Sequence, residues 1–171
     1  MSTLSKNSWI PISAATLSLI IWRIAIGYHP HSGEGEDHDF KAAYGGDYEA
    51  QRHWMEVTLH LNVGEWYYYD LSYWGLDYPP LTAYVSYICG YLSHVLVGPE
   101  SVALFDSRGY EDSLHKSFMR ATVLFLDVFI YFSAVYVLVK RLVARRKDSD
   151  SVFLWSYVIA LAQVGSLISV L

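Results

Sequence analysis

Three long apolar runs constrain this chain more than any other feature of its sequence. They cover residues 9–28, 118–139 and 152–171, and each approaches the roughly 20 residues that a helix needs to cross a bilayer core. Charged residues make up 17 % of the chain, below the roughly 25 % of an average soluble domain. No small-x-small cleavage pattern follows the first run, so we expect an uncleaved anchor. The sequence predicts an all-α membrane protein with about three transmembrane helices.

Basic residues after the second run give the chain a predicted orientation. Five lysines and arginines fall within residues 140–147, and short basic loops stay in the cytoplasm. The segment of residues 29–117 should then lie on the other side, with helices at residues 47–61 and 78–97. The second of these helices is apolar enough to span the membrane. However, the first apolar run already crosses outward and the second run crosses back, so no crossing remains for this helix. Its spaced tyrosines predict that it lies in the outer interface.

The densest polar cluster lies at the start of the first of these helices. Asp47 follows two glycines and is well placed as an N-cap. Glu49 and His53 are four residues apart, as are Arg52 and Glu56. On this pattern alone we favour two ion pairs on a solvated face, each contributing only about 0.2–0.5 kcal/mol. The position of the cluster, outside the first apolar run and beside many aromatic residues, raises the case for a binding or catalytic role.

A second cluster is aromatic and acidic. Residues 66–70 read WYYYD, and residues 73–80 read YWGLDYPP. Aromatic rings flanked by carboxylates suit sugar binding, because CH faces stack on rings and hydroxyls need acceptors. Tyr and Trp also mark membrane interfaces, and composition alone favours that interpretation. Both interpretations hold if a sugar site lies at the membrane surface.

Other chemistries have little support in the sequence. His53, Glu56 and His60 could share a helix face, but their spacing is not HExxH, and scattered exposed polar residues are the simpler interpretation. Cys89 is the only cysteine, so the chain can form no internal disulfide and has no cysteine-based zinc motif. The net charge of −5 argues against a nucleic-acid partner.

Polar residues in or beside the apolar runs each have two interpretations. Asp127 lies inside the second run, where a carboxylate is costly, and we favour a structural polar contact over a functional role. Arg23 either snorkels to the interface or faces the protein interior. Four basic residues just before the second run either bind a phosphate or anchor the run at the interface, with neither favoured. These four residues are Arg108, His115, Lys116 and Arg120.

Three strings carry a resemblance to a known enzyme family. They are GDYEAQRHWMEVT at residues 46–58, WYYYDLSYWGLDYPPLTAY at residues 66–84 and SRGYEDSLHKSFMRATVLFLD at residues 107–127. Over roughly residues 22–141 the chain resembles the N-terminal portion of the dolichyl-phosphate-glucose-dependent α-1,3-glucosyltransferases. The resemblance implies part of a GT-C fold in the endoplasmic reticulum membrane, with several passes, a lumenal first loop containing two helices, and an active site facing the lumen. It also implies that no cofactor and no metal is needed.

The implied reaction transfers glucose from dolichyl phosphate glucose to the Man9GlcNAc2 oligosaccharide on dolichyl diphosphate, with inversion, in N-glycan precursor assembly. The EAQRHW string favours this branch over the sister enzyme that adds the second glucose. By motif match, Asp47 is the general base that takes the proton of the attacking mannose hydroxyl. Asp77 has an alternative role as the cap of the Pro-Pro helix. The residues expected to bind substrate are Glu49, Arg52, His53, Trp74, Asp77 and Tyr78.

Two features separate the chain from the family pattern. Two glycines precede Asp47 where the family usually has one. The chain also stops in its third apolar run, whereas family members are much longer, so residues 1–171 are expected to be an incomplete transmembrane domain that is inactive alone. The competing hypotheses are a non-catalytic membrane protein that binds glycan or stabilises a partner, and a channel or transporter subunit, for which the apolar runs hold few polar residues.

Overall fold

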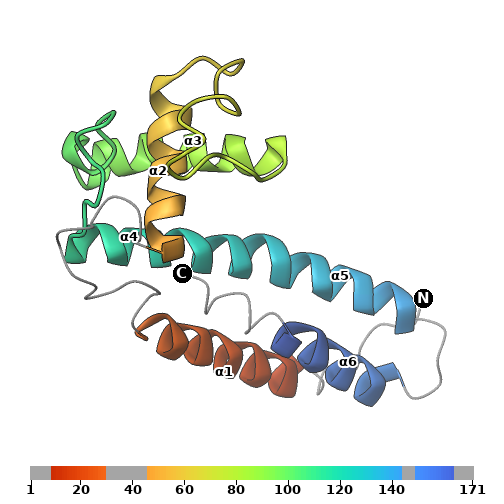
Figure 1. The fold of residues 1–171 in the computed structure, drawn as a ribbon. Helices are drawn as coiled ribbons and strands as arrows, with labels where there is room; N and C mark the ends of the chain where they lie inside the picture. Colours follow the sequence, from red (N-terminus) through yellow and green to blue (C-terminus); the bar gives the residue numbers. More distant parts are fainter. Residues whose placement is uncertain (1–8, 30–45, 144–148, 164–171) are drawn as a thin grey trace. The chain divides into compact units, whose positions relative to one another are not determined.

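The computed structural model describes residues 9–29, 46–143 and 149–163, and most of this length is helical (Figure 1). No β-strand occurs within these three ranges, which confirms the all-α prediction. The elements are the α-helices α1 (Trp9–Gly27), α2 (Gly46–His60), α3 (Pro80–Leu96), α4 (Ser113–Leu126), α5 (Phe132–Val143) and α6 (Ser149–Gln163), the 3₁₀-turn η3 (Pro99–Ser101) and the π-helical turn η4 (Asp127–Tyr131).

The chain forms two compact units. The α1 unit contains α1, the end of α4 from Val123, η4, α5 and α6. The α2 unit contains α2, α3, η3 and α4 up to Thr122.

Among the residues that the structure describes, two helices are long and apolar enough to cross a membrane: Trp9–Gly27, with 19 residues, and Ser113–Val143, with 31 residues. They cover the first two apolar runs of the sequence. The third run contains a shorter apolar helix, Asp150–Ala162, and residues 164–171 of the predicted third span lie outside the described residues. The number of crossings and the non-cytoplasmic placement of residues 29–117 stay predictions.

An ion pair between a buried arginine and a partly buried aspartate joins the helices of the α1 unit. Arg23 on α1 is 2 % exposed and donates from Nε to Asp127 Oδ2 at 2.8 Å. Its Nη2 donates to the Leu161 carbonyl oxygen at 3.0 Å, and the guanidinium lies 4.8 Å from the centre of the Phe132 ring. Arg23 therefore faces the protein interior. Asp127, at the first position of η4, has the structural contact that the sequence favoured.

In the α2 unit, helices α2 and α3 pack closely through small side chains of α3. A Cβ at Gly90 would lie only 2.7 Å from the Met55 carbonyl oxygen, so glycine is what permits this close approach. The buried residues of α3 are Ala83, Ser86, Cys89, Gly90 and Ser93.

The opposite face of α3 is apolar and exposed. Its residues recur every three or four positions, which places them on one side of the helix. Five of them are between 49 % and 77 % exposed: Leu81, Tyr84, Ile88, Tyr91 and Val95. The amphipathic pattern of α3 is therefore inverted relative to a helix in water, with small and polar side chains packed inside and large apolar ones outside.

Candidate functional site

Asp47 is the second residue of α2, so the helix begins one residue before the predicted N-cap. Gly46 has a φ of 61°, in the left-handed region that favours glycine. The chain therefore turns sharply as it enters the helix. Asp47 is half-buried in the first helical turn, where the helix dipole favours a negative charge.

Behind Asp47, α2 carries a buried ion network centred on Arg52. Its Nε donates to Glu49 Oε2 at 2.7 Å, and its Nη2 donates to Glu56 Oε2 at 2.9 Å. Its Nη1 donates to the Ser107 hydroxyl. Arg52 and Glu56 therefore pair as their spacing predicts, but the prediction of a solvated face is wrong, because Glu49 is 1 % exposed and the other two charged side chains are 0 % exposed.

Two loops close over this network. From the loop between α2 and α3, the Tyr73 hydroxyl donates to Glu49 Oε1 at 2.7 Å. From the segment between η3 and α4, the Phe105 N–H donates to Glu56 Oε1 at 2.8 Å, and the Ser107 hydroxyl lies 3.1 Å from Glu56 Oε2. The network thus ties α2 to two segments that are distant in sequence.

The network also sets the protonation of its members. Burial opposes ionisation of Glu56, but hydrogen bonds from His53, Arg52 and the Phe105 N–H, with the Arg52 charge, lower the pKa of that carboxyl to about 2. Burial and the bond to Glu49 raise the pKa of Tyr73, so its hydroxyl keeps the proton that it donates. At neutral pH, Glu56 is therefore ionised and Tyr73 is neutral.

The loop between α2 and α3 holds the other predicted residues. Trp54 Nε1 donates to the Trp74 carbonyl oxygen at 3.0 Å, and the ring of Tyr78 lies 5.0 Å from that of Trp54, centre to centre. Asp77 and Tyr78 are both exposed. Helix α3 has Pro79 as its N-cap and no side-chain cap, so the alternative role of Asp77 as a helix cap is wrong.

The basic residues predicted as a cluster lie just before α4 and on it, and they have partners inside the protein. Arg108 forms an ion pair with Asp70, and Lys116 forms one with a neighbouring glutamate. The His115 ring lies with Nδ1 2.7 Å from the Tyr48 hydroxyl, in the interior of the α2 unit. Arg108, Lys116 and His115 are thus engaged by three different protein groups.

His53, Glu56 and His60 do not meet as metal ligands. His53 Nδ1 lies 3.2 Å from Glu56 Oε2, whereas His60 Nε2 lies 2.8 Å from the Val102 carbonyl oxygen. Within the described ranges of the chain, no three His, Cys, Asp or Glu side chains come together as a set that could hold a metal ion.

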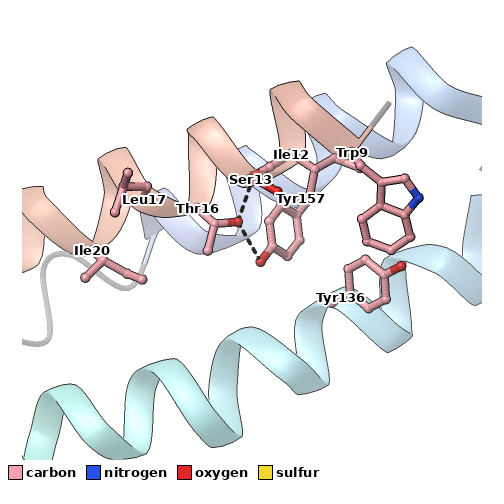
Figure 2. A pocket seen from close by; sticks show the side chains of 8 residues that line it. All are labelled: Trp9, Ile12, Ser13, Thr16, Leu17, Ile20, Tyr136 and Tyr157. Atoms are coloured by element: carbon pink, nitrogen blue, oxygen red, sulfur yellow. Dashed lines mark hydrogen bonds between the residues drawn. The ribbon is translucent and has the colours of Figure 1, made fainter. Parts of the chain in front are cut away.

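The α1 unit contains a separate pocket of about 350 Å³ (Figure 2). The Thr16 hydroxyl lies 2.8 Å from the Ile12 carbonyl oxygen and 3.3 Å from the Tyr157 hydroxyl, as the dashed lines in Figure 2 show. None of its lining side chains is an acid or a base that could move a proton near neutral pH, so we place the candidate site in the α2 unit. The lining residues are Trp9, Ile12, Ser13, Thr16, Leu17, Ile20, Tyr136 and Tyr157.

Sequence reasoning did not single out Tyr73, Phe105 or Ser107, although all three hold the ion network. Tyr73 lies in the aromatic string, where many tyrosines look alike. Ser107 is the first residue of the string at residues 107–127 that carries the family resemblance, and this was the only sequence signal for Ser107. Phe105 takes part through its backbone N–H, which no side-chain pattern could indicate.

The two apolar helices of membrane length indicate a membrane-associated helical protein. Its α2 unit adds carboxylates, arginines and aromatic rings, which are side chains suited to carbohydrate chemistry. A comparison with protein families narrows this class, because the ALG6, ALG8 glycosyltransferase family matches residues 19–169. The chain belongs to this family.

Curated relatives agree with this assignment. The chain is 45 % identical over 145 residues to the dolichyl pyrophosphate Man9GlcNAc2 alpha-1,3-glucosyltransferase of Saccharomyces cerevisiae, covering 84 % of this chain and 26 % of the yeast protein. It is 51 % identical over 133 residues to the protein named probable dolichyl pyrophosphate Man9GlcNAc2 alpha-1,3-glucosyltransferase in Arabidopsis thaliana, covering 75 % and 24 %. A Drosophila melanogaster protein with the same name is 51 % identical over 119 residues, covering 67 % and 25 %. The chain thus spans about a quarter of the length of these relatives.

Proposed function

We propose that this chain supplies the general base and part of the acceptor site of a glucosyltransferase. The proposed reaction moves glucose from dolichyl phosphate glucose to the lipid-linked Man9GlcNAc2 oligosaccharide in an α-1,3 linkage. The observation that carries the proposal is the similarity to relatives whose names specify this acceptor and linkage, over a family match that includes all of α2. Those names also favour this reaction over addition of the second glucose.

The chemistry follows from inversion at the anomeric carbon. In-line attack by a mannose hydroxyl requires a carboxylate to take its proton in the transition state. Asp47 suits this role because it is half-buried at the start of α2, where a carboxylate is both held and reachable. The dolichyl phosphate leaves as an anion. Its departure therefore depends more on cations that stabilise this charge than on an acid that donates a proton.

The proposed substrate-binding residues fall into two groups by burial. Asp77 and Tyr78 are exposed and can meet the substrate directly. Glu49, Arg52 and His53 are at most 1 % exposed. Direct contact between these three and a substrate therefore requires a local rearrangement, for example of the loop whose Tyr73 hydroxyl donates to Glu49.

The proposed setting is the endoplasmic reticulum membrane, with the α2 unit on the lumenal side and lipid as a further partner. The exposed apolar face of α3 supports it, since Leu81, Ile88 and Val95 lie along one side of a 17-residue helix. Such a face binds the boundary between headgroups and acyl chains. It gives the α2 unit a surface that lies along the membrane instead of crossing it.

The test is transfer activity in a chain extended with the C-terminal portion of the yeast relative. The extended protein is expressed in cells that lack the first glucosyltransferase, and the lipid-linked oligosaccharide is read by mass spectrometry. The wild-type sequence should add one hexose, and Asp47→Asn should reduce this addition by about 100-fold or more at equal protein abundance. The control is Asp106→Asn, an exposed carboxylate in the same unit, which should leave the addition unchanged.

Two results would count against the proposal. Full activity of Asp47→Asn would mean that the base lies elsewhere. No hexose addition by the wild-type extension, with the protein folded and abundant, would favour a non-catalytic glycan-binding protein instead.

A further inference from the structure

A second cluster of polar and aromatic side chains lies at the surface of the α2 unit, and the proton transfer assigned to Asp47 does not use it. The Arg108 guanidinium lies 4.3 Å from the centre of the Tyr73 ring and 5.2 Å from that of the Phe105 ring. Its Nη2 donates to the Asp70 carboxylate. The side chains of this pair are 24 % and 25 % exposed, and Phe105 is 55 % exposed. We name Asp70, Tyr73, Phe105 and Arg108 the Arg108 cluster.

The backbone holds the Arg108 cluster in a strained shape. Asp70 has a φ of 38° and Phe105 a φ of 67°, and no other non-glycine residue of the described chain has a positive φ. Such conformations persist only where surrounding contacts maintain them. Here the Ser72 hydroxyl donates to Asp70 Oδ1 at 2.8 Å, and the Phe105 N–H is held by Glu56. The Asp70 carboxylate and the Phe105 backbone are therefore each held by a further contact, and both residues contact Arg108.

A buried nitrogen without a partner among the described residues lies against the same cluster. His53 is 0 % exposed, and its Nε2 makes no hydrogen bond with the part of the chain that the structure describes. Its ring meets that of Tyr73 edge-on, at 4.8 Å between centres, and stacks at 6.5 Å with that of Tyr69. Buried polar atoms are nearly always satisfied, so a polar group of a ligand that enters beside Tyr73 would complete this one.

The charge balance selects the class of ligand. The three negative charges of Glu49, Glu56 and Asp70 outnumber the two positive charges of their partners Arg52 and Arg108, which leaves no excess of cations for a phosphate. A carboxylate, a guanidinium and aromatic faces at one surface instead suit a neutral ligand with many hydroxyls.

We propose that the Arg108 cluster is a carbohydrate subsite that binds a neutral hexose, with the sugar ring on Phe105 and its hydroxyls on Asp70 and Arg108. The identity of that hexose as a mannose of the acceptor oligosaccharide rests on the proposed function. The subsite would hold a sugar that does not react, and so would position the acceptor relative to Asp47.

The experiment measures binding of the free Man9GlcNAc2 oligosaccharide to the 171-residue chain in lipid nanodiscs, by saturation-transfer NMR. Phe105→Gly removes the ring and relieves the positive φ, and it keeps the N–H that Glu56 binds. Asp70→Asn removes the charge and retains a residue that tolerates this backbone. Each should weaken binding by about fivefold to tenfold.

Two controls isolate the subsite. Tyr91→Ala removes an aromatic ring that is 56 % exposed on α3, and it should leave the affinity within about twofold, because that ring is outside the cluster. Asp47→Asn should also retain binding, because the proposed role of Asp47 is proton transfer. Loss of transfer with retained binding in Asp47→Asn separates the two proposals.

Three outcomes would overturn the subsite. The first is unchanged binding in Phe105→Gly and Asp70→Asn, with thermal unfolding showing that both variants are folded. The second is absence of any oligosaccharide binding by the wild-type chain. The third is displacement of the oligosaccharide by inorganic phosphate, which would make the cluster an anion site.

Discussion

At the scale of single residues, Arg52 is the most constrained side chain of the α2 unit. Burying charged groups is costly unless each is paired and hydrogen-bonded. Arg52 donates to two carboxylates and a hydroxyl, and those groups come from α2 itself and from the segment before α4. Its loss would leave two carboxylates without their cation in the interior, whereas loss of a peripheral hydrogen bond would leave the ion pairs intact.

We therefore predict a graded pair of effects on stability. Arg52→Ala should lower the free energy of unfolding by about 3–5 kcal/mol, because it strands Glu49 and Glu56. Tyr73→Phe should lower it by about 1 kcal/mol, the typical contribution of one hydrogen bond. Denaturant unfolding followed by tryptophan fluorescence measures both, since Trp54, Trp66 and Trp74 lie in this unit. Equal and small effects from both substitutions would show that the network does not stabilise the fold.

At the scale of elements, local signals in the sequence were enough for the helices but not for their contacts. The predicted helix of residues 47–61 is observed as Gly46–His60, and that of residues 78–97 as Pro80–Leu96. Glycine and proline mark these starts, so the boundaries are nearly correct. The Arg52–Glu56 pair also follows from helical spacing. The contact between Arg52 and Ser107 does not, because it joins residues 55 positions apart in the sequence.

The close packing of α2 and α3 gives a prediction at this scale. Gly90→Ala should lower the free energy of unfolding by about 1–3 kcal/mol, because the added Cβ would overlap the Met55 carbonyl oxygen on α2. Gly64→Ala is the matched control, since a Cβ there meets nothing within 4 Å and the backbone conformation suits any residue. Thermal unfolding of the two variants, compared with the wild type, measures the difference. A similar shift in both would mean that α2 and α3 pack less closely than described.

At the scale of the whole molecule, the chain places its charges differently in the two units. The described part of the α2 unit carries an ion network and a surface ion pair on a polar helix and its loops. In the α1 unit, the buried Arg23 and the partly buried Asp127 form an ion pair between otherwise apolar helices, and they are 104 positions apart in sequence. Helical spacing relates only residues that are close in sequence. The sequence therefore did not identify Arg23 and Asp127 as partners.

The last prediction tests what that ion pair does. Removing one partner, by Arg23→Met or Asp127→Leu, should lower the free energy of unfolding by about 3–5 kcal/mol, because the other charge, at most 14 % exposed, is left without its partner. The double variant should cost much less than the sum, since apolar residues can replace a buried ion pair with little loss. Unfolding in mixed micelles, followed by circular dichroism, gives the coupling energy, with Leu17→Ala as a control at an exposed position of α1. Additive single and double effects would show that the two charges act independently, whereas strong coupling would identify the pair as the contact that fixes α1 against η4.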